Sequence, residues 1–235
     1  MSSYKSLVTC VVFAWIVSSA TAQPADDALL VRKTKNFDIT GDGTASAWKT
    51  TEWIPLEKRK GSSTYSTQAK VLYSDQGIYA LFSCKDKKIT ASFQEDFANL
   101  WTEDVVEIFF WPDESSAIYF EYELSPLNYE LPILVPNMNG QFLGWRPWQY
   151  EGERKTRHAT KIIKADNGET TAWIAEFFIP FALLKPLQNV PPKSGQSWRM
   201  NMYRIDYDNE YTSWSWRPVK TNFHDYERFG TIRFE

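Results

Sequence analysis

Cysteine and histidine are scarce, with two of each among the 235 residues. Cys10 lies in an N-terminal apolar segment that we expect to be removed, which leaves Cys84 alone and excludes an intramolecular disulfide. The sequence around Cys84 predicts a buried strand residue. His158 and His224 are far apart in the sequence, so we do not expect a zinc site built from histidines.

Long apolar runs are also missing, apart from SLVTCVVFAWIV near the start. This run is too short to cross a membrane, which takes about 20 residues. The small residues SSATA follow it, with Ala20 and Ala22 at the spacing that a signal peptidase recognises. We therefore expect residues 1–22 to be a signal peptide. Residues 23–235 would form a single domain without a membrane span, exported to the periplasm or out of the cell.

Neither sign of charge dominates, because 26 Lys and Arg residues stand against 29 Asp and Glu residues, for a net charge of −3. No stretch forms a basic stripe, so nucleic acid is not expected as a partner. Aromatic residues, in contrast, make up 16% of the chain and include 11 tryptophans. A core needs some of these rings, and the excess favours a surface that binds a ligand through them.

Short runs with period-two alternation and turn residues between them predict strands along most of the chain. The expected strands are 68–73, 78–84, 104–111, 117–124, 158–164, 171–178, 198–206 and 230–234. Only 179–187 resembles a helical turn. Many short strands without helices between them predict an all-β fold, an antiparallel β-sandwich. Residues 126–157 are predicted to be a long irregular insertion, and connections of that length are usually functional or mobile.

The strand expected at 104–111 contains an acid, and the period of two decides which way this acid points. Val106, Ile108 and Phe110 share an apolar face that should enter the core. Glu107 then lies on the opposite face, where its carboxylate needs a partner or water. Alternation in the neighbouring strands would place further polar residues beside it: Tyr119, Glu121, Glu123, Asn201 and Tyr203.

Carboxylates, an amide and phenols on one face suit a polyhydroxylated ligand, because these groups bond hydroxyls. Aromatic rings would complete such a site by covering the C–H face of a sugar. Trp101 stands just ahead of Glu107, and Trp145 and Trp148 lie in the polar sequence GWRPWQYEG. A solvated outer sheet face, with each glutamate paired to a Lys or Arg across the strands, would show the same alternation.

Catalysis is a second possibility for the acids. Glycosidases hold two carboxyl groups about 5 to 9.5 Å apart across the scissile bond. Glu121 and Glu123, on one expected strand, have about that separation, but they would point side by side. The sequence contains no P-loop, no dinucleotide fingerprint and no nucleophile paired with a base. Whether the chain is an enzyme stays open, and a glycosidase is the enzyme that the acids would favour.

Two oxygen-rich segments, 38–48 and 206–210, are candidates for binding calcium, which prefers oxygen ligands in exported proteins. Asp38 and Asp42 are the candidate ligands in the first segment. Neither segment has the spacing of an EF-hand loop. Turn chemistry also explains both of them without a metal.

Seven segments follow one another in an order that indicates a family: FDITGDGTASAW, VLYSDQGIYALFSCKD, LWTEDVVEIFFWPDESSAIYFEYELSP, WIAEFFIPFALL, WRMNMYRID, SWSW and NFHDYERFGTIRF. Together they resemble carbohydrate-binding module family 9, and most closely its stand-alone exported bacterial members. The most specific parts are the final F-G and a W-x-x-D-x-x-E-x-F element made by Trp101, Asp104, Glu107 and Phe109.

The resemblance implies a jelly-roll β-sandwich related to DOMON domains, with structural calcium and a sugar site between two tryptophans. By this resemblance Trp101 is one stacking residue, and Phe223 takes the place of the second tryptophan. Glu107 matches an acid that bonds sugar hydroxyls. The family's ligand-binding arginine falls near Glu121 and its glutamine near Tyr203, so the charge of the pocket would be reversed here.

Residues and resemblance together predict an exported, non-catalytic carbohydrate-binding protein that takes part in polysaccharide recognition and carbohydrate catabolism. Its partners would be a poly- or oligosaccharide and glycan-degrading enzymes. A glycoside hydrolase, or an accessory module of one, is the first alternative. A haem-binding DOMON-type domain is the second, and Met200 or Met202 with His224 would be its axial ligands. The expected ligand-binding residues are Trp101, Glu107, Glu121, Trp145, Trp148, Asn201, Tyr203 and Phe223.

Overall fold

The computed structural model describes residues 28–235. The predicted signal peptide lies outside this part of the chain, so the signal peptide and the single domain from residue 23 stay predictions. Within the described part, no helix is both long enough and apolar enough to span a membrane.

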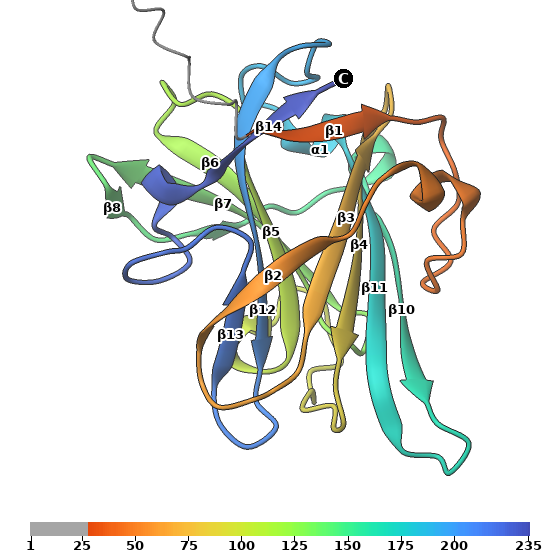
Figure 1. The fold of residues 1–235 in the computed structure, drawn as a ribbon. Helices are drawn as coiled ribbons and strands as arrows, with labels where there is room; N and C mark the ends of the chain where they lie inside the picture. The colour runs from red at the N-terminus through yellow and green to blue at the C-terminus, as the bar shows by residue number, and fades with distance from the viewer. Residues whose placement is uncertain (1–27) are drawn as a thin grey trace, which may run out of the picture.

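Two β-sheets packed face to face make up the fold, which confirms the predicted sandwich (Figure 1). Neighbouring strands within each sheet are antiparallel. The first sheet contains, in spatial order, β10 (Arg157–Lys164), β11 (Thr170–Pro180), β4 (Gly77–Lys85) and β3 (Thr67–Tyr73). The second sheet contains β14 (Gly230–Phe234), β12 (Ser197–Asp206), β5 (Val105–Trp111), β6 (Ile118–Leu124) and β7 (Glu130–Met138).

Strands that the sequence analysis missed join the two sheets at their edges. β1 (Leu29–Lys33) runs parallel to both β3 and β14. β2 (Ile54–Lys60) is antiparallel to β3 and to β13 (Thr212–Ser215), and β13 in turn pairs with β12. One edge of the sandwich is therefore closed by backbone hydrogen bonds, whereas no strand among residues 28–235 joins the sheets at the opposite edge, where β10 and β7 lie.

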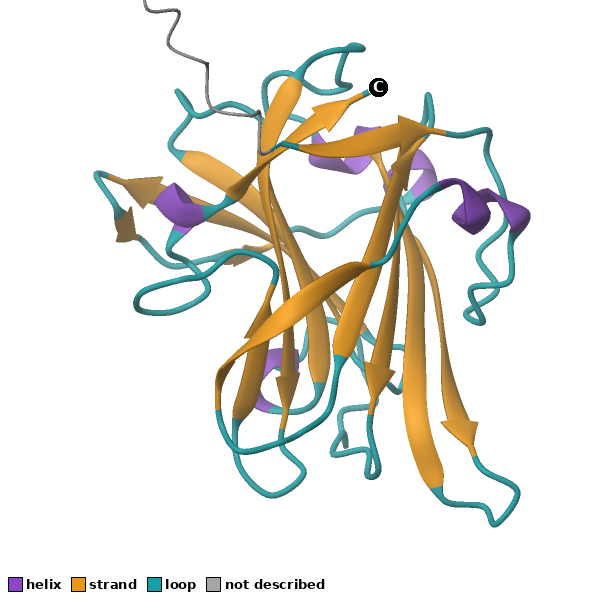
Figure 2. Ribbon diagram, in the orientation of Figure 1, coloured by secondary structure: helices purple, strands orange, loops and turns teal. Residues whose placement is uncertain are grey.

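Helical structure is short and lies at the ends and edges of the sandwich (Figure 2). The helix α1 (Phe181–Leu184) confirms the helical turn predicted within 179–187. The other helical segments of residues 28–235 are short 3-10 helices: η1 (Ser46–Thr50), η2 (Leu100–Thr102), η3 (Gly152–Arg154) and η4 (Tyr226–Arg228).

The core between the sheets follows the predicted alternation. Val106, Ile108 and Phe110 of β5 are fully buried between the sheets, and Met200 and Met202 of β12 lie in the same core. The other face of the second sheet, here called its outer face, therefore carries the odd-numbered residues of β5, β6 and β12. That outer face has its own buried cluster, which is roofed by loops and contains the polar residues considered below.

The predicted irregular insertion at 126–157 is only partly irregular. Its residues 130–138 form β7, which pairs with every residue of β6. Two short strands, β8 (Gln141–Phe142) and β9 (Arg146–Pro147), pair with the other side of β7. Pro132 and Pro136 favour an irregular segment over a strand, because proline has no backbone N–H to donate to a neighbouring strand. They are tolerated here because β7 lies near the edge of the sheet, with only these two short strands beyond it.

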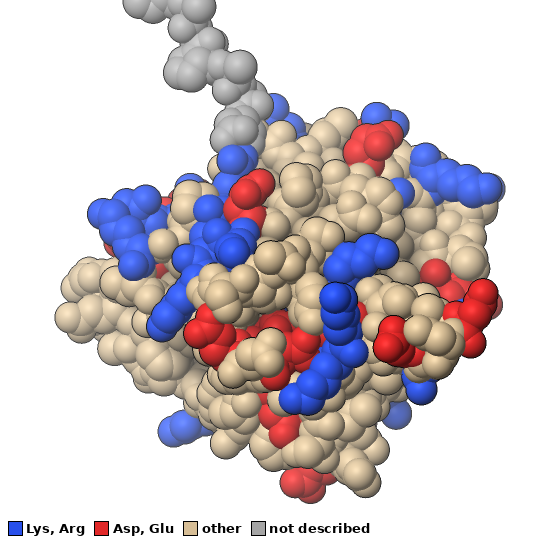
Figure 3. All heavy atoms as spheres, turned by 60° about the horizontal axis from the view of Figure 1, so that its bottom comes forward, with Lys and Arg blue, Asp and Glu red and all other residues tan. Residues whose placement is uncertain are grey.

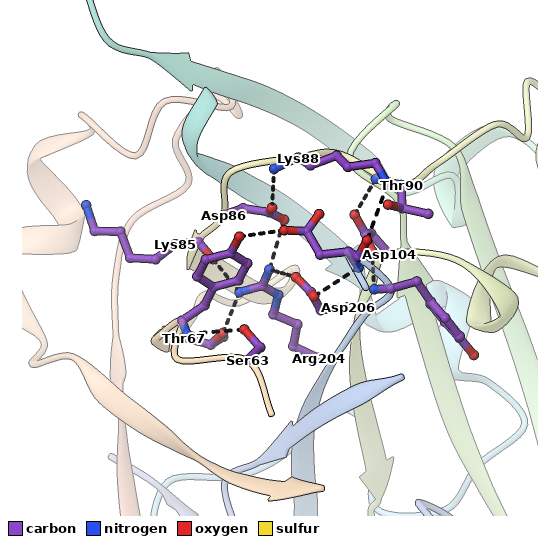
Figure 4. Close-up of polar contacts among 12 residues, drawn as sticks. Ser63, Thr67, Lys85, Asp86, Lys88, Thr90, Asp104, Arg204 and Asp206 are labelled. Atoms are coloured by element: carbon purple, nitrogen blue, oxygen red, sulfur yellow. Dashed lines mark hydrogen bonds and ion pairs between the residues drawn. The ribbon is translucent and has the colours of Figure 1, made fainter. Parts of the chain in front are cut away.

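A buried ion cluster ties β12 to the first sheet at one end of the sandwich (Figure 4). The Arg204 guanidinium donates to the Asp86 carboxylate at 2.9 Å and to the Asp206 carboxylate at 2.6 Å. It also donates to the Thr67 hydroxyl and to the Lys85 carbonyl oxygen. All three charged side chains are buried, and the cluster gives partners to both terminal nitrogens of an arginine that the alternation places inside the core.

The aspartate of the W-x-x-D-x-x-E-x-F element has a structural role. The Asp104 carboxylate accepts hydrogen bonds from the Thr90 amide at 2.6 Å and from the Tyr207 amide at 2.8 Å. It thereby holds two loops beside the start of β5, next to the turn that carries Trp101.

Candidate functional site

Three glutamates form the floor of a pocket on the outer face of the second sheet. Strand register places Glu107 of β5 directly opposite Glu123 of β6 and also opposite Tyr203 of β12. Glu121 lies one pleat further along β6, opposite Phe109. The sequence prediction that these acids share one surface is confirmed.

Aromatic side chains from several loops surround this floor. The pocket has a volume of about 710 Å³, which is within the range of about 300–1,000 Å³ that is usual for small-molecule sites. Trp101 from η2 and Trp145 from the segment before β9 meet edge to face, with ring centroids 5.4 Å apart. The main aromatic lining consists of Trp101, Phe142, Trp145, Tyr207, Tyr211 and Phe223.

Phe223 comes from the loop between β13 and η4. This loop packs on the outer face of the second sheet. Its ring stacks on Tyr203 with a centroid distance of 4.0 Å and an interplanar angle of 14°. The Tyr203 hydroxyl donates to the Phe223 carbonyl oxygen at 2.9 Å. Asn201 donates to the Tyr203 hydroxyl and exchanges two hydrogen bonds with the backbone of Arg217.

Three predicted ligand-binding residues lie elsewhere. Asn201 and Tyr203 are buried beneath the loop and do not line the pocket, because their polar atoms are used to hold Phe223 in place. Trp148 packs against the sandwich core, and its indole N–H donates to the Leu183 carbonyl oxygen at 2.8 Å. The prediction that Trp148 closes the site is therefore wrong.

The floor glutamates are withdrawn from solvent, with exposed fractions of 2% for Glu107, 4% for Glu121 and 1% for Glu123. One carboxylate oxygen of Glu121 and one of Glu123 are buried and have no hydrogen-bond partner among the described residues. No Lys or Arg of residues 28–235 is among the groups that shift their pKa values. The alternative of a solvated sheet face with acids paired to basic residues is therefore wrong.

Burial is the main cause that raises the pKa of all three floor carboxyls well above the ordinary value. Neighbouring carboxylates add to this rise: Glu123 acts on Glu107, Glu107 acts on Glu121, and Glu121 acts on Glu123. Like charges this close favour retention of a proton. A hydrogen bond between the side chains of Glu121 and Glu123 raises the pKa of Glu123 further and partly opposes the rise at Glu121.

His224 is the histidine beside this floor. Its Nδ1 lies 2.7 Å from the Tyr119 hydroxyl and 3.7 Å from a Glu121 carboxylate oxygen. Burial lowers the pKa of His224 to about 4, so the imidazole is neutral near pH 7. Phe142 stacks on the other side of this ring at 4.0 Å. His224 thus gives the floor no positive charge.

These raised pKa values predict that stability falls as the pH rises from 6.5 to 8.5. In the unfolded chain, carboxyls have pKa values near 4 and are ionised throughout this range. The folded protein retains protons on the floor glutamates, and on Asp104, whose pKa burial raises to about 7. Stability that is present at low pH is then lost as the folded carboxyls ionise. His224 acts in the opposite sense only below about pH 6.5, its unfolded value.

The melting temperature measured across this range checks the prediction. We expect a steady fall for the native chain, and a shallower fall for Glu107→Gln, which removes one of the buried ionisable groups. A melting temperature that is flat or rises from pH 6.5 to 8.5 would contradict the buried, unpaired floor.

The candidate calcium ligands do not form a metal site. The Asp42 carboxylate accepts hydrogen bonds from Thr40 and Thr44, which lower its pKa to about 2 and fit an ordinary turn. Asp38 is exposed and lies 4.0 Å from Arg157. Residues 28–235 contain no group of three or more His, Cys, Asp or Glu that could hold a metal ion. The expected calcium stays a prediction, without support from these two residues.

The haem alternative has no suitable pair of ligands. Met200 and Met202 are buried between the sheets, whereas His224 lines the pocket on the outer face. The second sheet separates them, so these residues cannot bind the same iron from two sides.

A comparison with models of protein families identifies the family of this chain. A family model described as carbohydrate family 9 binding domain-like matches residues 39–235. The chain belongs to this family. The resemblance carried by the W-x-x-D-x-x-E-x-F element is thereby confirmed. A search of curated proteins finds no match.

Solved structures agree with the family 9 fold. A protein from Bacteroides uniformis, described as carbohydrate-binding, has a TM-score of 0.72 at 17% identity, covering 89% of this chain and 99% of its own. A family 9 module from Caldicellulosiruptor kristjanssonii in complex with cellotriose has a TM-score of 0.63 at 15% identity, covering 88% and 93%. The same module with glucose gives 0.62 at 15%, covering 88% and 95%. At these identities the likeness shows the fold alone.

Sequence analysis of this family 9 chain missed several lining residues. Phe142, Tyr207, Tyr211 and His224 all line the pocket. Glu123 was placed on the shared surface but was not chosen as a ligand-binding residue. Tyr207 and Tyr211 stand in the segment 206–210 and just after it, which had been interpreted only as a turn or a calcium loop. One aromatic residue inside that acidic segment and one just after it were the available signal.

Proposed function

We propose that this family 9 protein binds a carbohydrate in the pocket over Glu107, Glu121 and Glu123. The observation that carries the proposal is the pairing of a polar floor with an aromatic wall. Trp101, Trp145 and Phe223 supply half-buried rings that can cover the C–H faces of a sugar. Below them, the floor carboxyls line the pocket and can exchange hydrogen bonds with sugar hydroxyls.

The expected affinity is moderate. A ring that stacks on a planar ligand contributes about 1–3 kcal/mol by the scale known for base–aromatic stacking. Hydrogen bonds from the floor add to this, and lost freedom of the ligand offsets part of the sum. Dissociation constants from micromolar to millimolar are therefore expected.

The related modules guide the choice of test ligands. Two of the similar structures hold cellotriose and glucose. Gluco-oligosaccharides are therefore the first ligands to try, together with xylo-oligosaccharides and plant, algal and host glycans. On the face shown in Figure 3, acidic and basic side chains lie interspersed, which fits a neutral or weakly charged partner better than nucleic acid.

Calorimetric titration and a glycan array with the purified protein test the proposal. Saturable binding of at least one oligosaccharide, competed by its monosaccharide or disaccharide, is the expected result. If no glycan of a broad plant, algal and host panel binds at millimolar concentration, the proposal fails.

We also propose that the protein is exported and acts in the breakdown of polysaccharides. The N-terminal sequence favours export, and a carbohydrate-binding protein outside the cytoplasm would serve polysaccharide recognition and catabolism beside glycan-degrading enzymes. N-terminal sequencing of the protein expressed with all its residues tests export. A mature chain that begins at Gln23 is the expected result, and an uncleaved chain would contradict it.

A glycosidase is the second candidate, favoured by the raised pKa values of the floor carboxyls, since a general acid must hold a proton near neutral pH. We prefer binding without catalysis, because Glu107, Glu121 and Glu123 rise from two adjacent strands on one floor. Glycosidase carboxyls instead flank the bond from two sides. Release of sugar from a polysaccharide panel, abolished by Glu121→Gln, would establish the enzyme.

A further inference from the structure

The floor of the pocket brings three ionisable carboxyl groups together at one place. Glu107, Glu121 and Glu123 lie side by side, and each is more than nine-tenths buried. Two of their oxygens point to no partner among the described residues. Burial favours protons on these carboxyls. A neutral sugar can exchange hydrogen bonds with them, whereas a bound cation would stabilise their ionised form.

No Lys or Arg of residues 28–235 is among the groups that shift the pKa of the floor carboxyls, so none of them stabilises the ionised form. Of the basic residues that line the pocket, Arg59, Lys60 and Lys220 are exposed at its rim. The Arg59 guanidinium donates to the Ser215 side chain and backbone, and Lys60 lies over the ring of Tyr211. Charges at an exposed rim are screened by solvent, so they do not neutralise a buried floor.

A small cation bound to the sugar itself would complete the site. A primary ammonium group carries one positive charge and three donors, which matches several carboxylate oxygens gathered at one point. Charge-assisted hydrogen bonds of this kind are about twice as strong as neutral ones. A metal ion fits less well, because no group of three acids in residues 28–235 has a metal-binding arrangement.

We propose that this pocket selects sugars that carry an ammonium group, such as 2-amino-2-deoxy sugars, over neutral sugars. The inference rests on the proposed carbohydrate binding and names the ligand class for the same site. Trp101 and Phe223 would stack on the ring, while Glu121 and Glu123 would receive the ammonium group.

Three trisaccharides with the same linkage test the inference: β-1,4-linked glucosamine, N-acetylglucosamine and glucose. The first is cationic, the second bears a neutral amide at the same carbon, and the third has a hydroxyl there. Calorimetric titration near pH 6.5 should show at least about tenfold tighter binding of the glucosamine trimer, a ratio that corresponds to about 1.4 kcal/mol. The preference should weaken as salt is added, because it is electrostatic.

Variants that replace a floor glutamate by glutamine show whether these carboxyls cause the preference for the cationic sugar. Glu121→Gln and Glu123→Gln remove an ionisable carboxyl with little change in size, so both should fold. Each should bring the ratio between the cationic and neutral trimers toward one. Glu57→Gln removes an exposed acid outside the pocket and is the matched control. It should leave the ratio unchanged.

The outcomes separate the two proposals. If the glucose or N-acetylglucosamine trimer binds as tightly as the glucosamine trimer, the cationic preference is refuted and carbohydrate binding stands. If added calcium is what makes the neutral trimers bind, the carboxylates hold a metal and the preference is likewise refuted. If none of the three binds and the glycan panel is also silent, the carbohydrate-binding proposal itself fails.

Discussion

Trp101→Ala is expected to weaken glycan binding by about 5- to 150-fold, the effect of losing roughly 1–3 kcal/mol of stacking. Trp101 stands on the rim of the pocket floor, and its half-buried indole meets the edge of Trp145. Alanine removes the flat surface on which a sugar would lie and leaves the three floor glutamates in place. Calorimetric titration of the tightest oligosaccharide from the glycan panel measures the loss.

A second exposed tryptophan provides the control. Trp53 is 37% exposed and lies outside the pocket, with Lys70 over its ring. Trp53→Ala removes an indole of the same size from the surface and should leave the affinity unchanged. Melting curves of both variants exclude general unfolding as the cause. Equal affinities of Trp101→Ala and the native protein would show that the sugar binds elsewhere.

Arg204→Met is expected to lower the free energy of unfolding by about 3–5 kcal/mol, the typical result of removing one partner from a buried ion pair. Methionine fills a similar volume, but it leaves the carboxylates of Asp86 and Asp206 buried without their cation. It also leaves the Lys85 carbonyl oxygen and the Thr67 hydroxyl without a donor. Urea unfolding followed by tryptophan fluorescence measures the change.

Two further variants show whether charge causes the loss. The triple variant Arg204→Met, Asp86→Asn and Asp206→Asn removes the stranded charges, so it should recover much of the lost stability. Lys33→Met removes the exposed partner of Asp75 and should leave the unfolding free energy nearly unchanged. A stable Arg204→Met single variant would contradict the role of the cluster.

The sequence was sufficient to predict the floor of the site. A period of two in β5, β6 and β12 places alternate residues on opposite faces of a sheet, and the apolar set selects the inward face. The alternation therefore predicts that Glu107, Glu121 and Glu123 lie on one outer surface. Register between neighbouring antiparallel strands then brings them together without further information.

The walls of the pocket could not be predicted in the same way. Loops have no period, so the sequence does not show whether Trp148 turns toward the pocket or toward the Leu183 carbonyl. Tyr203 and Asn201 lie on the outer face, as predicted, but the loop that carries Phe223 covers them. Asn201 donates to the Tyr203 hydroxyl, which in turn donates to the Phe223 carbonyl oxygen. Such roofing depends on contacts between residues far apart in the chain.

The strands that join the two sheets were the other failure. β1 and β2 are mostly exposed and β13 is only four residues long, so their patterns are weak, and they form because backbone groups of the neighbouring strands need partners. β7 was missed because its two prolines outweighed its apolar run, although Leu131, Ile133 and Val135 are all buried in the outer-face cluster.

A crystal structure of the protein with a bound oligosaccharide tests the central claim most directly. The account predicts a sugar ring against the indole of Trp101, with hydroxyl or ammonium groups within about 3 Å of the Glu107, Glu121 or Glu123 carboxyl oxygens. A sugar bound away from this pocket, or one that touches none of the three glutamates, would contradict the account.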